Sequence, residues 1–186
     1  MRNYVLVLSS GGIDSTACIN FYKKADFDVD CLFVDYGQLS NERELSSIKK
    51  IANHFKVEFK TVKILSHSKY QRGEVLGRNA FLIFTALMNF RKKNGLVALG
   101  LHKGTPYYDS SNKFIEEIQE IVDKYSKGTV KINVPFIEFN KKEIYDYCIM
   151  EKIPLAYTYS CESGKKQPCG ECSTCKDLVE IYDNKK

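Results

Sequence analysis

A short polar loop that follows an apolar run is the first stretch of this chain able to do chemistry. The run Val5–Leu8 leads into Ser9-Ser10-Gly11-Gly12-Ile13-Asp14-Ser15-Thr16, and a helical pattern begins there. Adjacent glycines let the backbone approach a ligand, and N–H groups at a helix start favour a phosphate. Ser10, Ser15 and Thr16 add hydroxyl donors. Asp14 suits a helix cap, a Mg²⁺ ligand or both.

Four cysteines near the carboxyl end form a second reactive group. They fall within 15 residues, as Cys161, Cys169, Cys172 and Cys175. Cys-x-x-Cys spacing places two sulfurs within reach of one ion, and four thiolates close a tetrahedron around Zn²⁺ with no open position. The spacing therefore predicts one structural zinc ion per chain. An iron–sulfur cluster and a Cys-x-x-Cys redox pair are the alternatives.

Isolated charged residues are further candidates. Arg78 stands at the start of an apolar helix expected over Ala80–Phe90, where a cation is unfavourable unless an anion is bound nearby. A salt bridge to a carboxylate is the alternative. Lys141 and Lys142 stand at the start of a later helix and face either phosphate or solvent.

The segment His102–Ser111 is dense in polar and aromatic residues and follows an apolar run. We expect it to contact the acceptor, that is, the substrate that reacts with the phosphate-bearing ligand. An ordinary surface loop is the alternative. His102 is the nearest candidate for a general base, although a hydrogen bond to the backbone would explain it equally well.

Alternating elements must position these groups. Buried strands are expected at Val5–Leu8, Val29–Tyr36, Val57–Ile64, Leu96–Leu101 and Lys131–Val134, with helices between them. This alternation predicts an α/β fold with a Rossmann-like open parallel sheet of about five strands and flanking helices. Ligands bind at the carboxyl ends of such strands, so the loops after Leu8, Tyr36 and Leu101 share one rim.

Helix caps follow from the same reading. Ser40 and Asn41 are expected to cap the helix that ends near Phe55, and Asn140 with Glu143 forms a second capping pattern. Residues 65–77 read as a polar linker.

The composition of the chain limits the kinds of protein that it can be. The chain has 186 residues, 44% of them hydrophobic, which suits one domain with a full core. No apolar run reaches the length of about 18 residues that a membrane span needs, and the chain enters its first strand directly, so a cytoplasmic protein is expected. The net charge of +5 comes from 28 basic and 23 acidic residues in scattered groups, so no direct nucleic-acid binding is expected.

The Ser-Gly-Gly-x-Asp-Ser loop resembles the pyrophosphate (PP) loop of the ATP-pyrophosphatase superfamily. Gly77-Arg78-Asn79, Asn140-Lys141 and the stretch from Thr158 to Cys175 extend the likeness, and nearly the whole chain resembles the 7-cyano-7-deazaguanine synthase (QueC) family. The resemblance implies an adenine nucleotide alpha-hydrolase-like domain at 1–157, a zinc-binding tail at 158–186 and a homodimer.

The resemblance also implies site residues. ATP, with Mg²⁺, would be bound by Leu8, Ser9, Ser10, Gly11, Gly12, Ile13, Asp14, Ser15, Thr16, Tyr36 and Gln38. The substrate would be bound by Arg78, Asn79, His102, Lys103, Tyr108 and Asp109. The catalytic set would be Asp14, Arg78 and Lys141.

The implied reaction is an ATP-dependent ligation. ATP would adenylate the carboxylate of 7-carboxy-7-deazaguanine, ammonia would displace AMP, and a second ATP-driven step would dehydrate the amide to the nitrile 7-cyano-7-deazaguanine. This reaction belongs to queuosine biosynthesis.

One departure from the family keeps other functions open. The family typically carries Tyr-Pro-Asp-Cys-Arg where this chain has Tyr107-Tyr108-Asp109-Ser110-Ser111. The lost arginine would remove a bidentate hydrogen-bond donor. A QueC-like paralogue that acts on a protein, a tRNA or another small carboxylate is therefore the alternative. A non-catalytic nucleotide-binding module whose zinc tail docks a partner is a third hypothesis.

Overall fold

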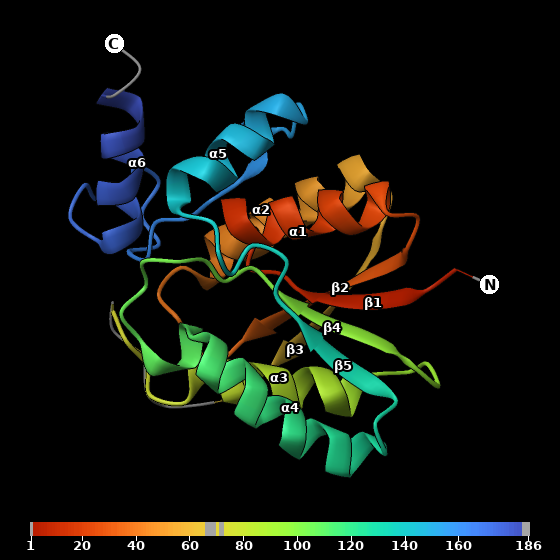
Figure 1. The fold of residues 1–186 in the computed structure, drawn as a ribbon. Helices are drawn as coiled ribbons and strands as arrows, with labels where there is room; N and C mark the ends of the chain where they lie inside the picture. Colours follow the sequence, from red (N-terminus) through yellow and green to blue (C-terminus); the bar gives the residue numbers. More distant parts are fainter. Residues whose placement is uncertain (1, 66–69, 71–72, 184–186) are drawn as a thin grey trace.

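A parallel five-stranded sheet, in the order β3-β2-β1-β4-β5, forms the centre of the molecule (Figure 1). The computed structural model describes residues 2–65, 70 and 73–183, and the side chains of residues 182 and 183 lie outside that description. The strands are β1 Tyr4–Leu8, β2 Asp28–Asp35, β3 Glu58–Lys63, β4 Gly95–Leu99 and β5 Val130–Asn133. The predicted fold class is confirmed.

Helices cover both faces of the sheet (Figure 1). One layer contains α1 Ile13–Lys24, α2 Asn41–Phe55 and α5 Lys141–Met150, and the other contains α3 Arg78–Asn89 and α4 Asn112–Ser126. A sixth helix, α6 Ser173–Asp183, lies beside the edge at which the strands end. Short 3₁₀ turns occur at Tyr108–Ser110 and Leu155–Tyr157.

Strand β1 explains why the core has two halves. All five of its residues are buried, and successive side chains point to opposite faces. Val5 and Val7 pack in the cluster beneath α1 and α2, whereas Leu6 and Leu8 pack in the cluster beneath α3 and α4. Burial of each such side chain stabilises the fold by about 1.5–3 kcal/mol. A strand covered on both faces has an unbroken apolar sequence, as Val5–Leu8 does.

The expected caps have mixed outcomes. Asn140 and Glu143 form a complete capping box at the start of α5, as predicted. Ser40 occupies the N-cap position of α2 as predicted, but its hydroxyl donates to the Glu44 carboxylate and caps no backbone N–H. Asn41 Oδ1 instead accepts a hydrogen bond from the N–H of Glu42.

Two segments differ from the sequence reading. Helix α3 begins at Arg78, two residues earlier than expected, and α6 was not expected at all. Residues 66–69, 71 and 72 of the predicted linker lie outside the described residues, while Tyr70 forms a β-bridge with Gln38.

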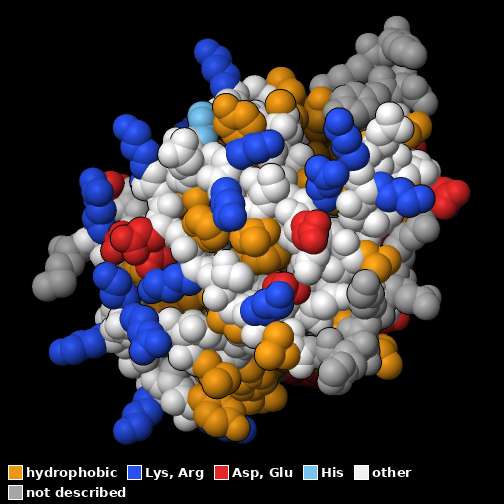
Figure 2. Space-filling view, turned by 180° about the vertical axis from the view of Figure 1, so that it is seen from behind, with side chains coloured by type: hydrophobic (Ala, Val, Ile, Leu, Met, Phe, Trp, Pro, Cys, Tyr) orange, Lys and Arg blue, Asp and Glu red, His pale blue; other side chains and the backbone are white. Residues whose placement is uncertain are grey.

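Lysine and arginine side chains are spread over the face seen in Figure 2, with apolar and acidic groups between them. No helix in the described ranges has the length and apolar character needed to cross a bilayer.

Candidate functional site

The loop between β1 and α1 makes a tight turn at Gly11. Its φ is +73°, and a Cβ added there would lie 2.8 Å from Ser47 Cβ and 2.9 Å from the Glu44 carbonyl oxygen. Only glycine satisfies both conditions. Gly12 then precedes α1 as its N-cap residue, without a side-chain cap from the helix itself. The backbone N–H groups of the first helical turn are therefore available to donate to a ligand or to another segment of this chain.

The loop hydroxyls divide into two kinds. Thr16 Oγ1 donates to the Gly12 carbonyl oxygen at 2.7 Å, and Ser15 Oγ donates to the same oxygen at 3.2 Å. Both residues are buried, so these two hydroxyls brace the loop from behind. Ser10 is exposed, and its Oγ accepts from the Gly12 N–H at 3.4 Å. Of the three predicted hydroxyl donors, Ser10 is the one on the open side.

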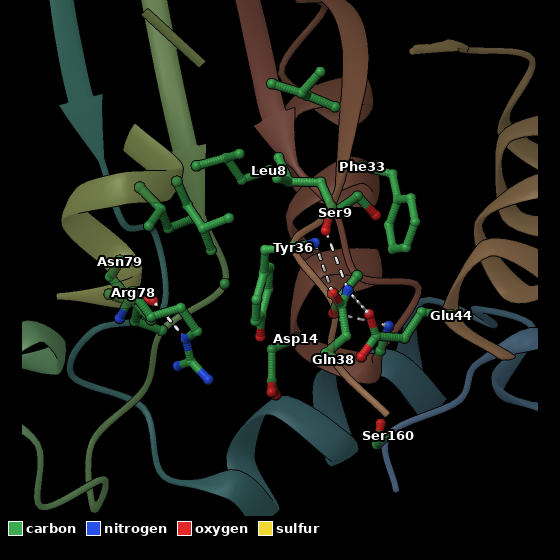
Figure 3. A pocket seen from close by; sticks show the side chains of 18 of the residues that line it. Leu8, Ser9, Asp14, Phe33, Tyr36, Gln38, Glu44, Arg78, Asn79 and Ser160 are labelled. Carbon is green, nitrogen blue, oxygen red and sulfur yellow. Dashed lines mark hydrogen bonds between the residues drawn. The ribbon is translucent and has the colours of Figure 1, made fainter. Parts of the chain in front are cut away.

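A pocket of about 260 Å³ opens beside this loop (Figure 3). Of the residues predicted to bind ATP, its lining includes Leu8, Ser9, Ser10, Gly12, Asp14, Tyr36 and Gln38. Gly11, Ile13, Ser15 and Thr16 do not line it. The side chains of Asp14, Tyr36 and Arg78 point toward the same space in Figure 3. We call this cavity the nucleotide pocket, because the sequence predicts ATP binding by residues that line it.

Gln38 is held rigidly at the edge of the nucleotide pocket. Its Nε2 donates to the Val34 carbonyl oxygen at 3.1 Å and to Glu44 Oε2 at 2.8 Å, and its Oε1 accepts from the Tyr36 N–H at 3.0 Å. Burial raises the pKa of Glu44, although hydrogen bonds from Gln38 and Ser40 oppose the shift. The sequence reading missed Glu44, which orients the Gln38 amide.

Arg78 stands at the start of α3 and lines the nucleotide pocket. Its Nε donates to Asn79 Oδ1 at 3.2 Å. Burial raises the pKa of Tyr36, and the Arg78 guanidinium opposes that shift. The described residues include no ion pair between Arg78 and a carboxylate, so the salt bridge weighed as the alternative is not observed there.

Asp109 has a structural partner. Its Oδ2 accepts from the Asn79 N–H at 3.0 Å, and its backbone oxygen accepts from Asn79 Nδ2 at 2.8 Å. It therefore caps the first turn of α3 from a distant loop. Tyr108 is exposed and its hydroxyl hydrogen-bonds to Glu117. Neither Asp109 nor Tyr108 lines a described pocket, and their contact with substrate stays a prediction.

A second, larger pocket of about 620 Å³ adjoins the first. Its lining includes the predicted His102, Lys103 and Lys141 together with Ser110, which was not in the expected substrate set. Asp14, Arg78, Gly100, Leu101, Glu162 and Thr174 line both pockets. We call this second cavity the acceptor pocket. The two cavities share a wall that carries two of the three predicted catalytic residues.

Lys141 pairs with Asp14 at that wall, with Nζ 2.7 and 2.5 Å from the two carboxylate oxygens. Asp14 lies in the first turn of α1, whose N-cap is Gly12, so Asp14 is not the helix cap. His102 Nδ1 lies 2.8 Å from the Lys103 carbonyl oxygen, which matches the backbone hydrogen bond considered for it.

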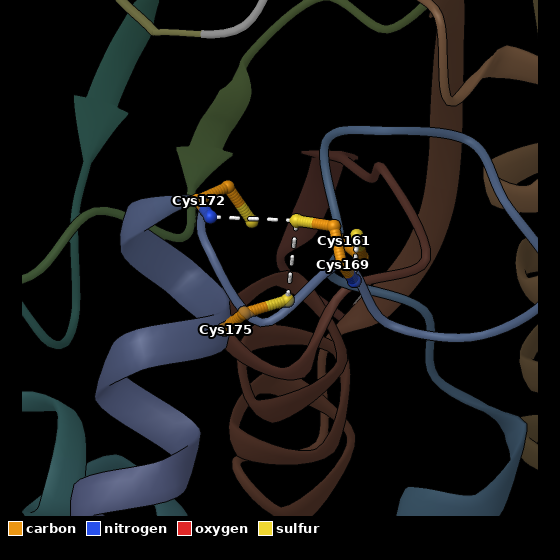
Figure 4. Close-up of side chains that lie close together, drawn as sticks. All are labelled: Cys161, Cys169, Cys172 and Cys175. Carbon is orange, nitrogen blue, oxygen red and sulfur yellow. Dashed lines mark hydrogen bonds between the residues drawn. The ribbon is translucent and has the colours of Figure 1, made fainter.

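The four predicted cysteines come together in the tail (Figure 4). Their sulfur atoms all lie within 4.8 Å of one another. A tetrahedral zinc site with Zn–S bonds of about 2.3 Å needs sulfurs about 3.8 Å apart, so the donor set fits that ion. Gly170, with φ of +72°, makes the turn inside the Cys-x-x-Cys knuckle.

Hydrogen bonds prepare one thiol for ionisation. Burial opposes charge on Cys161, but hydrogen bonds from Ser163 and from the Cys169 N–H outweigh it and lower the pKa of Cys161 to about 6. Burial raises the pKa of Cys175 to about 12. A bound cation would favour the thiolate form of all four.

The sheet order, the glycine turn after β1 and the pocket at the carboxyl ends of the strands define a PP-loop protein of the ATP-pyrophosphatase type. The thiolase NcsA from Methanococcus maripaludis, solved with its [4Fe-4S] cluster, shares this fold with a TM-score of 0.58 and 16% identity, over 98% of this chain and 66% of that one. A predicted tRNA methyltransferase subunit from Methanocaldococcus jannaschii gives a TM-score of 0.52 and 14% identity, over 77% and 73%.

The family is also defined. The model of queuosine biosynthesis protein QueC matches residues 4–76 and 65–184, so the chain belongs to the QueC family. A 7-cyano-7-deazaguanine synthase from Prochlorococcus marinus strain AS9601 is 30% identical over 96% of this chain and 93% of its own. One from Campylobacter jejuni strain NCTC 11168 is 28% identical over 94% and 91%. The resemblance stated from the motifs is confirmed.

Proposed function

We propose that this chain is an ATP-dependent ligase that converts 7-carboxy-7-deazaguanine and ammonia into 7-cyano-7-deazaguanine for queuosine biosynthesis. Membership of the QueC family supports the reaction. The observation that carries the assignment to this site is the shared wall, where Asp14 and Arg78 line both pockets. A carboxylate in the acceptor pocket would meet the α-phosphate of ATP at that wall.

The residues then divide the work. Backbone N–H groups after Gly12 and the hydroxyl of Ser10 would bind phosphate oxygens. Arg78 would stabilise the charge that develops as pyrophosphate leaves. Asp14 would bind Mg²⁺, which would neutralise part of the negative charge of the phosphates. Lys141 would add a second positive charge at the same place. Positioning of the two reactants accounts for much of the expected rate.

The reaction would proceed through two activations by ATP, first of the carboxylate and then of the amide. A carboxylate oxygen attacks the α-phosphorus of ATP, pyrophosphate leaves, and ammonia displaces AMP to give the amide. A second ATP activates the amide oxygen in the same way, and loss of AMP with protons gives the nitrile. The four cysteines would hold a zinc ion with no open position, so that ion would stabilise the tail rather than join the chemistry.

Ser110 motivates one alternative acceptor. It is buried and lines the acceptor pocket where the family typically has cysteine, with Ser111 in place of arginine beside it. A QueC-like enzyme that applies the same ATP chemistry to another carboxylate, on a protein, a tRNA or a small molecule, is the second candidate.

The test is direct product analysis. Purified protein is incubated with ATP, Mg²⁺, ammonium and 7-carboxy-7-deazaguanine, and the nitrile, AMP and pyrophosphate are quantified by chromatography and mass spectrometry. We expect two AMP per nitrile. ATP turnover with other carboxylates but not with this one would favour the second candidate. Absence of ATP turnover with every acceptor would leave only a binding module.

A further inference from the structure

The cysteine tail reaches further into the site than a structural appendage would. The Tyr159 N–H donates to the Gly11 carbonyl oxygen at 2.9 Å, which adds the tail backbone directly to the glycine turn. Gly164, with φ of +70°, lies so close to the segment before α2 that an added Cβ would be 2.1 Å from the Leu39 carbonyl oxygen. A backbone hydrogen bond at Gly11 and a close approach that requires glycine at Gly164 therefore hold the tail against the loop and the segment before α2.

Ser160, one residue before the cysteine ligand Cys161, lies on the open side of the loop. Its Oγ accepts from the Ile13 N–H at 3.4 Å and lies 3.4 Å from the position of a Cβ added to Gly12. Ser160 also lines the nucleotide pocket (Figure 3). Ser10 Oγ holds the neighbouring Gly12 N–H at the same 3.4 Å.

Both contacts are at the long limit for an N–H···O hydrogen bond. A hydroxyl that accepts from an N–H still has its own proton to donate, and among the described residues Ser160 donates it to none. A phosphate oxygen entering between the two serines would gain the N–H groups and both hydroxyl donors. Ser160 thus has the geometry of a ligand-binding residue.

Glu162, one residue after Cys161, connects the cysteine cluster to the segment before α3. Its Oε2 accepts from the Gly73 N–H at 3.0 Å and its Oε1 accepts from Ser173 Oγ at 3.2 Å. The Glu162 N–H hydrogen-bonds to the Cys172 thiol. Gly73 belongs to the segment that leads into α3, so Glu162 ties the start of α6 and the cysteine loop to the approach to Arg78.

We propose that the cysteine loop forms one wall of the nucleotide site, with Ser160 as a phosphate-binding residue and Glu162 as a positioning residue for the segment before Arg78. This inference rests on the proposed function, because it assumes that ATP occupies the nucleotide pocket. Metal held by Cys161 would fix both neighbours, so release of the metal weakens nucleotide binding.

The test measures affinity for a non-hydrolysable ATP analogue with Mg²⁺ by calorimetry. Ser160→Ala is expected to bind about two- to tenfold more weakly, the range for one hydrogen bond. Ser46→Ala, at an exposed position of α2, is the matched control and should bind as the wild type does. Elemental analysis should find the same metal content in both. Unchanged affinity in metal-loaded Ser160→Ala would overturn the role of Ser160.

Conservative rescue tests Glu162. Glu162→Ala should weaken binding, whereas Glu162→Gln should restore it because the amide oxygen still accepts from the Gly73 N–H. Equal losses in both variants would overturn the positioning role, and Glu116→Gln, exposed on α4, is the control.

Metal release supplies the third measurement. Chelation should weaken binding of the analogue by more than Ser160→Ala does, and added zinc should restore it. Unchanged affinity after metal release would contradict the inference. If the wild type produces the nitrile but Ser160→Ala binds the ATP analogue with unchanged affinity, the inference about Ser160 is overturned and the proposed function stands. If Ser160→Ala loses affinity but the wild type produces no nitrile, the inference stands and the proposed function is overturned.

Discussion

Lys141 and Asp14 join the first turns of α5 and α1 across 127 positions of sequence. Their side chains are only 10% and 20% exposed, so solvent screens the attraction poorly. Two predicted catalytic residues thus neutralise each other at the wall between the pockets. A divalent cation that binds Asp14 would replace the lysine as the charge partner and free the ammonium group for phosphate.

The first prediction concerns this pair. In a double-mutant cycle with Asp14→Asn and Lys141→Met, we expect a coupling free energy of about 1–3 kcal/mol from denaturant unfolding. The exposed i,i+4 pair Lys142–Asp146 is the matched control and should give about 0.3–0.5 kcal/mol. A coupling for Asp14 and Lys141 no larger than that of the control would contradict the argument that burial protects this ion pair from screening by solvent.

The second prediction separates chemistry from stability at Asp14. Asp14→Asn keeps a hydrogen-bond acceptor for Lys141 but loses the charge that Mg²⁺ needs. We expect turnover to fall by about 100-fold or more. The melting temperature should fall only by the amount that the lost coupling of about 1–3 kcal/mol implies, about 2–12 °C, so most of the chain stays folded at the assay temperature. Turnover and thermal unfolding are measured on the same preparations. Full activity in the variant would remove Asp14 from the mechanism.

The third prediction concerns the metal. Purified protein should contain one zinc per chain, and Cys172→Ser should lower zinc content and increase amide hydrogen exchange in α6 before it does so in the sheet. The reason is that the four cysteines and α6 share one short segment. Four iron atoms per chain after anaerobic purification, or no metal, would overturn the zinc assignment.

The fourth prediction tests Asp109 as a cap. Asp109→Ala leaves the Asn79 N–H without its acceptor and should cost about 0.5–2 kcal/mol of unfolding free energy, whereas Asp109→Asn should cost less. Tyr108→Phe, at an exposed neighbour, is the control. Normal stability of Asp109→Ala together with a raised KM for the carboxylate would favour the substrate role expected from the motif.

The fifth prediction distinguishes the two serines. Ser111 Oγ accepts from the Phe114 N–H as the N-cap of α4, so Ser111→Arg should cost about 1 kcal/mol, or about 2–4 °C in Tm. Ser110→Cys should instead change KM for 7-carboxy-7-deazaguanine, because Ser110 lines the acceptor pocket. Steady-state kinetics and thermal unfolding of each single variant separate the effects.

The double variant decides between acceptors. A gain of tenfold or more in kcat/KM for 7-carboxy-7-deazaguanine on introducing Cys and Arg together would show that the native loop suits another carboxylate. Efficient conversion by the wild type would instead remove the altered-acceptor candidate.

The sheet was predictable because its strands are buried on both faces. Val5 and Val7 alternate with Leu6 and Leu8 in one unbroken apolar run, and the adjacent glycines mark where the run ends. The cysteine cluster was predictable for a related reason, since its four cysteines are close in sequence. Local pattern is sufficient wherever the interacting groups are neighbours along the chain.

Long-range contacts were not predictable in that way. The hydrogen bond between Asp109 and Asn79, 30 positions apart, has no signal in the loop's own sequence, where Asp109 is predicted from the motif as a substrate residue. Ser160 and Glu162 were missed because their partners Ile13 and Gly73 lie 147 and 89 positions earlier. Helix α6 was not predicted because Cys175 lies in its first turn, and the spacing of the cysteines there indicated a metal site rather than the start of a helix.

The contact between Ile13 and Ser160 has a consequence for how the protein is made. Loop closure between groups so far apart in sequence is entropically costly and comes late in folding. A nascent chain can complete the pairing of β1 with β4 while residues beyond 160 are still inside the ribosome. The glycine turn after β1 would then wait, uncovered on one side, for the segment around Ser160 to emerge.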